Sequence, residues 1–289
     1  MSARRADGRA AKRYLGRMNL QAYYERIGFE GEAKPDLATL TALHRAHLLT
    51  IPYENLDVQL GRPLTTDPAA AFDKIVTRRR GGWCYEMNGL FGAVLAEIGF
   101  KVTRMAGAAM RELMGDIVIG NHLVLLVEID GEPWIADVGF GDGALDPFPL
   151  APAALSFGGY PFRLEAMDEG WWRFHNHEFG GAKSFDFQVE PADPELLSGR
   201  CEWLQYAPDS HFVLNAIVQR HRADEILQMR GRVLRRVTPA GVTQETIGSA
   251  EEWVEVLARE FDLDVPEAAT LWPRVLARHE EVMAAAAPA

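Results

Sequence analysis

Cys84 follows two glycines and a tryptophan and directly precedes an apolar, helix-like run, in the stretch RRRGGWCYEMNG at residues 78–89. A thiol is a weak nucleophile near its free pKa of about 8.5, and a helix N-terminus or a neighbouring imidazolium activates it. The apolar run has helical spacing, so the thiol falls at a helix start, where unpaired N–H groups favour an anion. The glycines allow unusual backbone angles and close approach of a substrate. The pattern suits a nucleophile, although a free cysteine on a helix is more often a buried structural residue.

The spacing of a β-hairpin supplies a base and a group to orient it. Two β-rich runs flank Asp130 and Gly131, a pair typical of a two-residue hairpin turn. With these residues as the turn, the register places His122 opposite Gly139, and Asp137 lies two residues from Gly139. His122 and Asp137 then share one face as a diagonal pair with Cα atoms about 7–8 Å apart. An imidazole and a carboxylate can hydrogen-bond across that gap, which predicts the second half of a Cys–His–Asp triad.

The first third of the chain is predicted to be a bundle of four helices. Asn19 can cap the first helix and Gly28 can end it, while Asp67 and Pro68 open the third and Gly99 closes the fourth. The four predicted segments are 19–28, 37–51, 67–76 and 84–99.

After residue 99 the pattern favours strands joined by tight turns, as in an antiparallel sheet or small barrel. A second hairpin is predicted around residues 168–170, and residues 183–190 form a further alternating strand. From about residue 204 the pattern is mixed, with a helix opened by the capping-box pair Ser249 and Glu252. The predicted strands of this part are 212–219, 225–229 and 232–237, followed by a turn at 239–241 and then helices.

Composition narrows the class of protein. The net charge of −11 over 289 residues argues against a broad nucleic-acid surface. No apolar run approaches the roughly 18 residues of a membrane span, and the basic N-terminus lacks the apolar core of a secretory signal. We expect residues 1–18 to be a disordered tail. Two cysteines are too few for a disulfide framework, so we expect a reduced, cytoplasmic protein.

Four segments, in order, resemble the bacterial arylamine N-acetyltransferases, and the match spans roughly residues 19–275. The segments are IPYENLDVQLGRPL, RRRGGWCYEMNGLF, NHLVLLVEIDGEPWIADVGFG and QRHRADEILQMRGRVL. Arg-Gly-Gly-x-Cys is specific to that family, as are the intervals of 38 and 15 residues from Cys84 to His122 and on to Asp137. The resemblance implies an α+β fold with a cysteine-protease-like catalytic core. Its implied parts are a basic tail (1–18), a helical bundle with the cysteine (19–99), an antiparallel β-barrel with the histidine and aspartate (100–203) and an α/β lid (204–289).

The resemblance also implies a ping-pong reaction of xenobiotic metabolism. Acetyl-CoA would be the co-substrate, and an aromatic amine, arylhydrazine or N-hydroxyarylamine would be the acceptor. Cys84 would carry the acetyl group as a thioester. His122 would hold the sulfur as a thiolate–imidazolium pair and relay the acceptor's proton, while Asp137 would fix the tautomer of the ring.

Five further residues match positions of the family. Glu54 and Arg80 match a charged pair that braces the active-site loop, and we read them as structural support. Phe140 and Gly141 match positions that line the acyl and acceptor pocket, and Phe212 is a weaker match to an aromatic residue of that pocket. One departure is Met87, which stands where many members have Gln. The acceptor wall, the preference for acetyl over longer acyl groups and the physiological acceptor therefore stay open.

Other signals are weaker. His175 and His177 share a strand face but have no evident third ligand, so no metal site is predicted. No G-x-G-x-x-G precedes a helix, so we expect no tightly bound cofactor, and CoA would be held by loop N–H groups and basic side chains. Cys201 is read as a structural residue after a strand, and His44 and His47 as surface or packing residues.

Two other classes of protein use parts of this pattern. A cysteine protease or transglutaminase-like hydrolase would apply the same triad to amides, and a non-catalytic binding module would keep the fold. A related acyltransferase or amide synthase with another acyl donor is a further alternative. We expect no nucleic-acid or membrane partner, and the oligomeric state stays open, a homodimer included.

Overall fold

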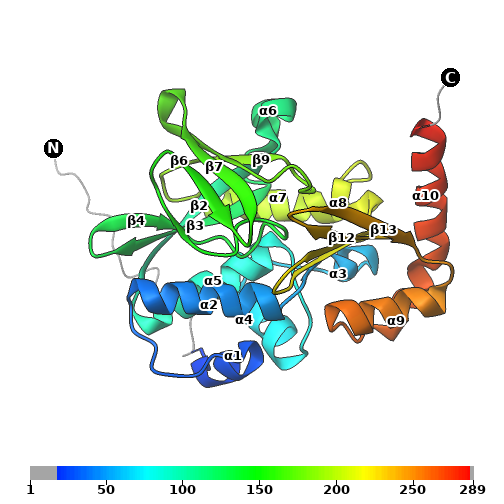
Figure 1. The fold of residues 1–289 in the computed structure, drawn as a ribbon, viewed down its shortest axis with the longest axis horizontal. Helices are drawn as coiled ribbons and strands as arrows, with labels where there is room; N and C mark the ends of the chain where they lie inside the picture. The colour runs from blue at the N-terminus through cyan, green and yellow to red at the C-terminus, as the bar shows by residue number, and fades with distance from the viewer. Residues whose placement is uncertain (1–17, 287–289) are drawn as a thin grey trace.

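The computed structural model describes residues 18–286, and Figure 1 shows their arrangement. The tail expected over residues 1–18 lies outside the described part except for Met18, which packs against the core of the helical part. Within residues 18–286, no helix combines the length and apolar character that crossing a bilayer requires.

All four predicted helices of the first third form. Asn19 accepts a hydrogen bond from the backbone of the first helix, which Gly28 ends in the left-handed conformation. The helices are α1 (Leu20–Ile27), α2 (Leu37–Thr50), the short α3 (Leu56–Gln59), α4 (Pro68–Phe72) running into a π-helical turn (Asp73–Thr77), and α5 (Cys84–Ile98). Their apolar faces build one core together with the inner face of the adjoining sheet, including Leu125 and Val127.

The middle of the chain forms an eight-stranded antiparallel sheet with the order β5-β4-β3-β2-β9-β8-β7-β6. Its strands are β2 (Lys101–Ala109), β3 (His122–Ile129), β4 (Glu132–Ile135), β5 (Phe148–Pro149), β6 (Ala153–Phe157), β7 (Tyr160–Ala166), β8 (Trp171–His175) and β9 (Ser184–Gln188). Both predicted hairpins are confirmed, with Ile129 paired to Glu132 across the turn at Asp130 and Gly131. Between β2 and β3 lie the short helix α6 (Arg111–Met114) and a 3-10 turn (Gly115–Val118).

The last third adds a second antiparallel sheet with the order β1-β10-β11-β12-β13. Its strands are β1 (Tyr53–Glu54), β10 (Ile217–His221), β11 (Ile226–Arg230), β12 (Val233–Thr238) and β13 (Gly241–Thr246). The helices are α7 (Pro194–Tyr206), α8 (His211–Leu214), α9 (Ala250–Phe261), a 3-10 segment (Pro266–Leu271) and α10 (Trp272–Ala286). Figure 1 shows α9 and α10 on the outer side of this sheet, and Trp253 and Phe261 of α9 fill its core.

The sequence-based prediction was wrong at three points of this last third. The strand expected over 212–219 begins only at Ile217, because Ser210 caps the short helix α8 at residues 211–214. The segment after the turn at 239–241 is strand β13, which pairs with β12, before the predicted helix begins. Cys201 lies within α7 rather than after a strand, although it is buried as a structural residue would be.

Candidate active site

Cys84 is the first residue of α5, and its side chain is only 3% exposed. Trp83 precedes the helix in an extended conformation, and its N–H donates to the Glu86 carboxylate at 3.3 Å. This bond satisfies one of the N–H groups that every helix start leaves unpaired. The predicted placement of the thiol at a helix start is therefore confirmed.

The two glycines before Trp83 allow close packing of the backbone around them. A Cβ on Gly81 would lie 2.1 Å from the Pro52 carbonyl oxygen, and one on Gly82 would lie 2.8 Å from Glu86 Cβ. The freedom that glycine has for unusual backbone angles is not used in the form of a positive φ at either position. The two glycines let the strand segment at residues 52–54 lie directly against the loop that leads to Cys84.

His122 and Asp137 meet as the hairpin register predicts. His122 begins β3, its Nε2 lies 2.7 Å from Asp137 Oδ2, and both side chains are buried. Asp137 lies two residues beyond β4 rather than within it, although the Ala136 N–H still pairs with the Leu125 carbonyl at 3.0 Å. One further ladder bond after the last assigned strand residue is enough to keep the diagonal geometry.

Both ends of the hairpin lie next to Cys84. Cys84 Sγ lies 3.8 Å from the carbonyl oxygen of Asn121, the residue directly before His122. A Cβ on Gly139 would lie 2.8 Å from Cys84 Cα, so the segment after Asp137 runs against the backbone of Cys84. Both halves of the predicted triad thus reach the first turn of α5.

Asn88 connects α5 to the hairpin, and it was not among the predicted site residues. It lies one turn after Cys84 on α5, and its amide donates to Asp137 Oδ1 at 2.7 Å and to the Leu123 carbonyl at 2.5 Å. Its own oxygen accepts the Val138 N–H at 2.9 Å. The signal was present in the sequence, because a residue four positions after Cys84 shares its helix face.

Burial acts on the pKa of both Asp137 and Cys84. It raises the pKa of Asp137, but His122, the Asn88 amide and the Gly139 N–H outweigh it and hold the pKa of this carboxyl below its ordinary value. Burial also raises the pKa of the Cys84 thiol, and the backbone N–H groups beside it offset this only in part. A helix start alone therefore does not give a thiolate here, so the proton needs an acceptor nearby.

One predicted pocket ring contacts His122, and the other contacts Trp83, the residue before Cys84. The ring of Phe140 lies 5.3 Å from the ring of His122, measured between centroids, and the ring of Phe212 on α8 lies 5.3 Å from that of Trp83. Gly141 has a φ of +79°, and a Cβ there would lie 2.0 Å from Gln219 Oε1, so a side chain does not fit. Gly141 therefore contributes only backbone, which packs against β10.

Asp142 fastens the loop that carries Phe140 to the second sheet. Its Oδ2 accepts hydrogen bonds from Gln219 of β10 at 2.7 Å and from Gln228 of β11 at 2.8 Å. The Gly181 N–H donates to the same oxygen at 2.7 Å. Burial raises the pKa of this carboxyl, and the converging N–H donors suit its charged form.

A family model described as N-acetyltransferase matches residues 36–270. The arylamine N-acetyltransferase of Escherichia coli is 36% identical over 216 residues, which cover 71% of this chain and 74% of that protein. That of Mycolicibacterium smegmatis is 35% identical over 269 residues, or 87% of this chain and 94% of the relative. The chain belongs to the arylamine N-acetyltransferase family.

Solved structures of the family extend this likeness to the fold. The Mycobacterium marinum arylamine N-acetyltransferase in complex with CoA superposes with a TM-score of 0.81 at 29% identity, covering 91% of this chain and 99% of that one. An M. smegmatis structure gives a TM-score of 0.82 at 33% identity, with 89% and 97% covered. The mixed fold with antiparallel sheets is therefore that of the family, as predicted.

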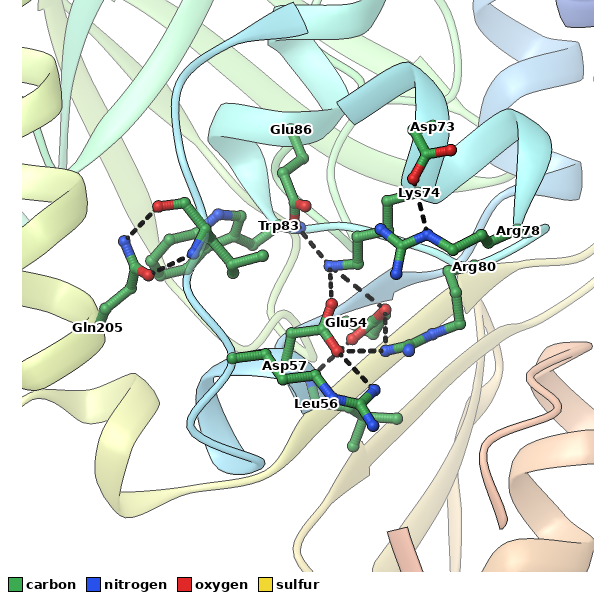
Figure 2. A network of polar contacts seen from close by, with 12 residues as sticks. Glu54, Leu56, Asp57, Asp73, Lys74, Arg78, Arg80, Trp83, Glu86 and Gln205 are labelled. Carbon is green, nitrogen blue, oxygen red and sulfur yellow. Dashed lines mark hydrogen bonds and ion pairs between the residues drawn. The ribbon is translucent and has the colours of Figure 1, made fainter. Parts of the chain in front are cut away.

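Glu54 and Arg80 form the expected ion pair within a larger buried network (Figure 2). Arg80 Nη2 lies 2.8 Å from Glu54 Oε1 and 3.2 Å from Asp57 Oδ1. A second cation, Lys74, contacts the same two carboxylates and Glu86. The sequence predicted the pair but not Lys74 or Asp57, since no local pattern shows that they face it.

His175 and His177 each have a protein partner. His175 Nε2 lies 2.8 Å from Glu165 Oε2, and His177 Nε2 lies 3.1 Å from the Asp142 carbonyl oxygen. Among the described residues no cluster of three or more possible metal ligands occurs. His44 and His47 are both buried in the helical core, which fits the packing role predicted for them.

We predict that Asn88→Ala destabilises the protein by about 1–3 kcal/mol, because it leaves the Leu123 carbonyl and the Val138 N–H buried without partners. Acetyl transfer should fall at least tenfold, since Asp137 then loses a donor that fixes it. Urea denaturation and steady-state rates check both effects. Gln21→Ala, which removes an exposed amide from α1, is the matched control, and equal behaviour of the two variants would contradict the assignment.

We predict that Asp137→Asn destabilises the protein in a pH-dependent way. The folded-state pKa of Asp137 lies below its unfolded value of about 3.9. Its contribution is therefore fully present above that pH and is lost as the pH falls through the folded pKa. The difference in unfolding free energy between wild type and variant should thus be larger at pH 7 than at pH 3, with turnover reduced roughly 10³–10⁴-fold. An equal difference at both pH values, or a normal rate, would refute this.

Proposed function

We propose that this chain transfers an acetyl group from acetyl-CoA to an aromatic amine, arylhydrazine or N-hydroxyarylamine, with Cys84 as the acyl carrier. The observation that carries the proposal is the convergence of the buried Cys84 with the hydrogen-bonded pair of His122 and Asp137. The relatives are arylamine N-acetyltransferases, and one solved relative holds CoA. Acetyl-CoA enters as a co-substrate, and the reaction needs no resident cofactor.

The first half-reaction moves the acetyl group onto the enzyme. His122 takes the proton of the Cys84 thiol, and the sulfur attacks the thioester carbonyl carbon of acetyl-CoA. The tetrahedral intermediate then expels the CoA sulfur, which receives the proton back from His122. One C–S bond forms and one breaks, so this exchange is nearly balanced in free energy.

The second half-reaction moves the acetyl group to the acceptor. The amine nitrogen attacks the Cys84 thioester, and His122 takes a proton from that nitrogen as the C–N bond forms. The proton passes to the sulfur when the C–S bond breaks, which restores the enzyme. An amide is more stable than a thioester, so this half-reaction makes the overall transfer favourable.

The burial of the site supports a protected intermediate. Cys84 is 3% exposed, the ring of Phe140 contacts that of His122, and the ring of Phe212 contacts that of Trp83. An aromatic acceptor would lie between these rings, where edge-to-face or offset contacts favour it over an aliphatic amine. Excluding water would also protect the acetyl-cysteine from hydrolysis.

We propose the same division of labour between parts of the chain as the family resemblance implies. Residues 19–99 would supply the nucleophile and residues 100–203 the base and its carboxylate, as in a cysteine-protease-like core. Residues 204–289 would act as the lid. In support, β1 at residues 53–54 pairs with β10, which links the loop near Cys84 to the lid sheet. A reducing, cytoplasmic location would keep the two free cysteines unoxidised.

We predict that incubation with acetyl-CoA adds one acetyl mass to Cys84 and that an arylamine removes it. Cys84→Ala and Cys84→Ser should show no adduct and should lose transfer by at least about 10³-fold while still folding, because the acyl-accepting sulfur is gone. Intact-mass spectrometry and thiol release measure the two halves separately. Cys201→Ser is the matched control and should keep both. Appreciable turnover by a Cys84 variant, or peptide cleavage without an adduct, would refute the proposal.

We predict that the pH dependence of Cys84 alkylation by iodoacetamide reports the partnership with His122. In the wild type the imidazole accepts the thiol proton, so the midpoint should lie below the free thiol pKa of about 8.5. In His122→Gln that acceptor is absent, and burial together with Asp137 should raise the midpoint above this value. The measurement is the alkylation rate against pH in both proteins. A wild-type midpoint at or above about 8.5 would remove the ion-pair step.

A further inference from the structure

Lys74 is a fully buried cation that the proposed reaction does not use. It lies in the π-helical turn after α4, and its side chain is 2% exposed. Its Nζ lies 2.8 Å from Glu86 Oε2, 3.3 Å from Asp57 Oδ2 and 3.5 Å from Glu54 Oε1. Figure 2 shows the ammonium group between the three carboxylates. Burying a lysine is costly unless it is paired, so this arrangement has a strong structural reason to persist.

The three buried carboxylates of this network differ in the cations that contact them. Lys74 and Arg80 face the carboxylates of Glu54, Asp57 and Glu86, each of which is at most 4% exposed. Arg80 contacts Glu54 and Asp57, whereas Lys74 is the cation that contacts Glu86. Without Lys74, Arg80 would still contact Glu54 and Asp57, and Arg62 would still contact Asp57 at 3.3 Å, but Glu86 would be left buried without a cation.

A short chain of contacts connects Lys74 to the nucleophile. Lys74 holds Glu86 Oε2, the same oxygen accepts the Trp83 N–H at 3.3 Å, and Trp83 directly precedes Cys84. Glu86 is the third residue of α5, so its carboxylate occupies the helix start that would otherwise favour a thiolate. Burial raises the pKa of Glu86, and Lys74 opposes that shift.

We infer that Lys74 is a positioning residue that fixes the first turn of α5 through Glu86 and keeps the buried carboxylates from suppressing the Cys84 thiolate. The inference rests on the proposed role of Cys84 as the acyl carrier. The Lys74 ammonium group touches neither substrate nor sulfur in this scheme. It acts through the position and the charge of Glu86.

The other titratable groups around the sulfur do not depend on Lys74. They are Tyr53 of β1, Tyr85 of α5, Cys201 of α7, and Asp137 with its partner His122. Those facing Lys74 are Glu54, Asp57 and Glu86, with Arg80 beside them. A substitution at position 74 therefore reaches the thiol by way of the carboxylates, and chiefly by way of Glu86.

The test replaces Lys74 by a neutral residue of similar shape. It measures the pH dependence of Cys84 alkylation and the rate of Cys84 acetylation. Lys74→Met should move the midpoint of Cys84 alkylation upward by about one pH unit or more, because a charged Glu86 is then unopposed in the first turn of α5, two residues after Cys84. The rate of Cys84 acetylation by acetyl-CoA at pH 7 should fall at least tenfold. Lys101→Met, which breaks an exposed pair with Glu128, is the matched control and should change neither value.

The double variant Lys74→Met/Glu86→Gln separates charge from general destabilisation. The amide oxygen introduced at position 86 would still accept the Trp83 N–H, and the unpaired carboxylate would be gone, so the midpoint and the acetylation rate should return toward the wild-type values. A folded Lys74→Met protein with wild-type midpoint and rate would overturn the inference. If the single variant does not fold, a folded double variant with the wild-type midpoint supports it. A double variant that fails to fold, or that keeps a raised midpoint, overturns it.

The proposed function and this inference fail in different experiments. Transfer by Cys84→Ser would refute the acyl carrier whatever Lys74 does. Another outcome is that Cys84→Ser loses transfer while Lys74→Met keeps the wild-type midpoint of Cys84 alkylation and the wild-type rate of acetylation. That pair of results would support the proposed function and refute only the positioning role of Lys74.

Discussion

The buried carboxylate of Asp137 is the interaction on which the site depends. It accepts hydrogen bonds from His122 at 2.7 Å, from Asn88 at 2.7 Å and from the Gly139 N–H at 2.8 Å. These donors belong to the hairpin, to α5 and to the segment after β4, so one charge joins the helical part to the eight-stranded sheet. A buried carboxylate is tolerated only when its lone pairs are filled in this way. The Asp137 carboxylate therefore fixes both the geometry of the predicted triad and the packing of α5 against the sheet.

A second buried network holds the opposite side of the same helix turn. Glu86 accepts the Trp83 N–H and an ion pair from Lys74, and Arg80 fixes Glu54 beside the loop that precedes Cys84. The Glu54 carboxylate also accepts the Leu56 N–H at 2.7 Å, which ties β1 to α3. Cys84 thus lies between two sets of buried charges, one that orients its base and one that fixes its backbone. Such networks are stable only when each charged side chain in them is paired. This requirement restricts the movement of the Cys84 backbone.

The features that the sequence predicted well are those that depend on neighbours along the chain. The turn at Asp130 and Gly131 sets the hairpin register, and the register alone brings His122 to Asp137. The helix start at Cys84 follows from local spacing and from the glycines before it. The meeting of Cys84 with the hairpin was expected from the family resemblance, because nothing local relates α5 to β3.

The features that were missed depend on contacts between distant segments. Strand β1 has two residues and exists only because Tyr53 pairs with Gln219, far along the chain. Helix α7 was missed because its apolar residues include Trp203, which stays largely exposed, so the helical stripe is poorly defined. Lys74 follows Asp73 in a helical stretch, where a charged side chain is normally read as solvent-facing. Its partners Glu54 and Asp57 come from a different part of the sequence, and no local pattern points to them.

Burial of the Cys84 sulfur has two opposite consequences for the proposed reaction. It raises the pKa of the Cys84 thiol, which opposes catalysis, but it also excludes the water that would hydrolyse an acetyl-cysteine. An isolated thiolate in such a place would cost more than the helix start returns. A proton that moves only as far as His122 leaves a neighbouring pair of opposite charges, and Asp137 stabilises the imidazolium that results. In the proposed reaction, the same burial that protects the intermediate therefore requires a base with its own carboxylate, and it gives the pairing of Glu86 with Lys74 a bearing on the chemistry of Cys84.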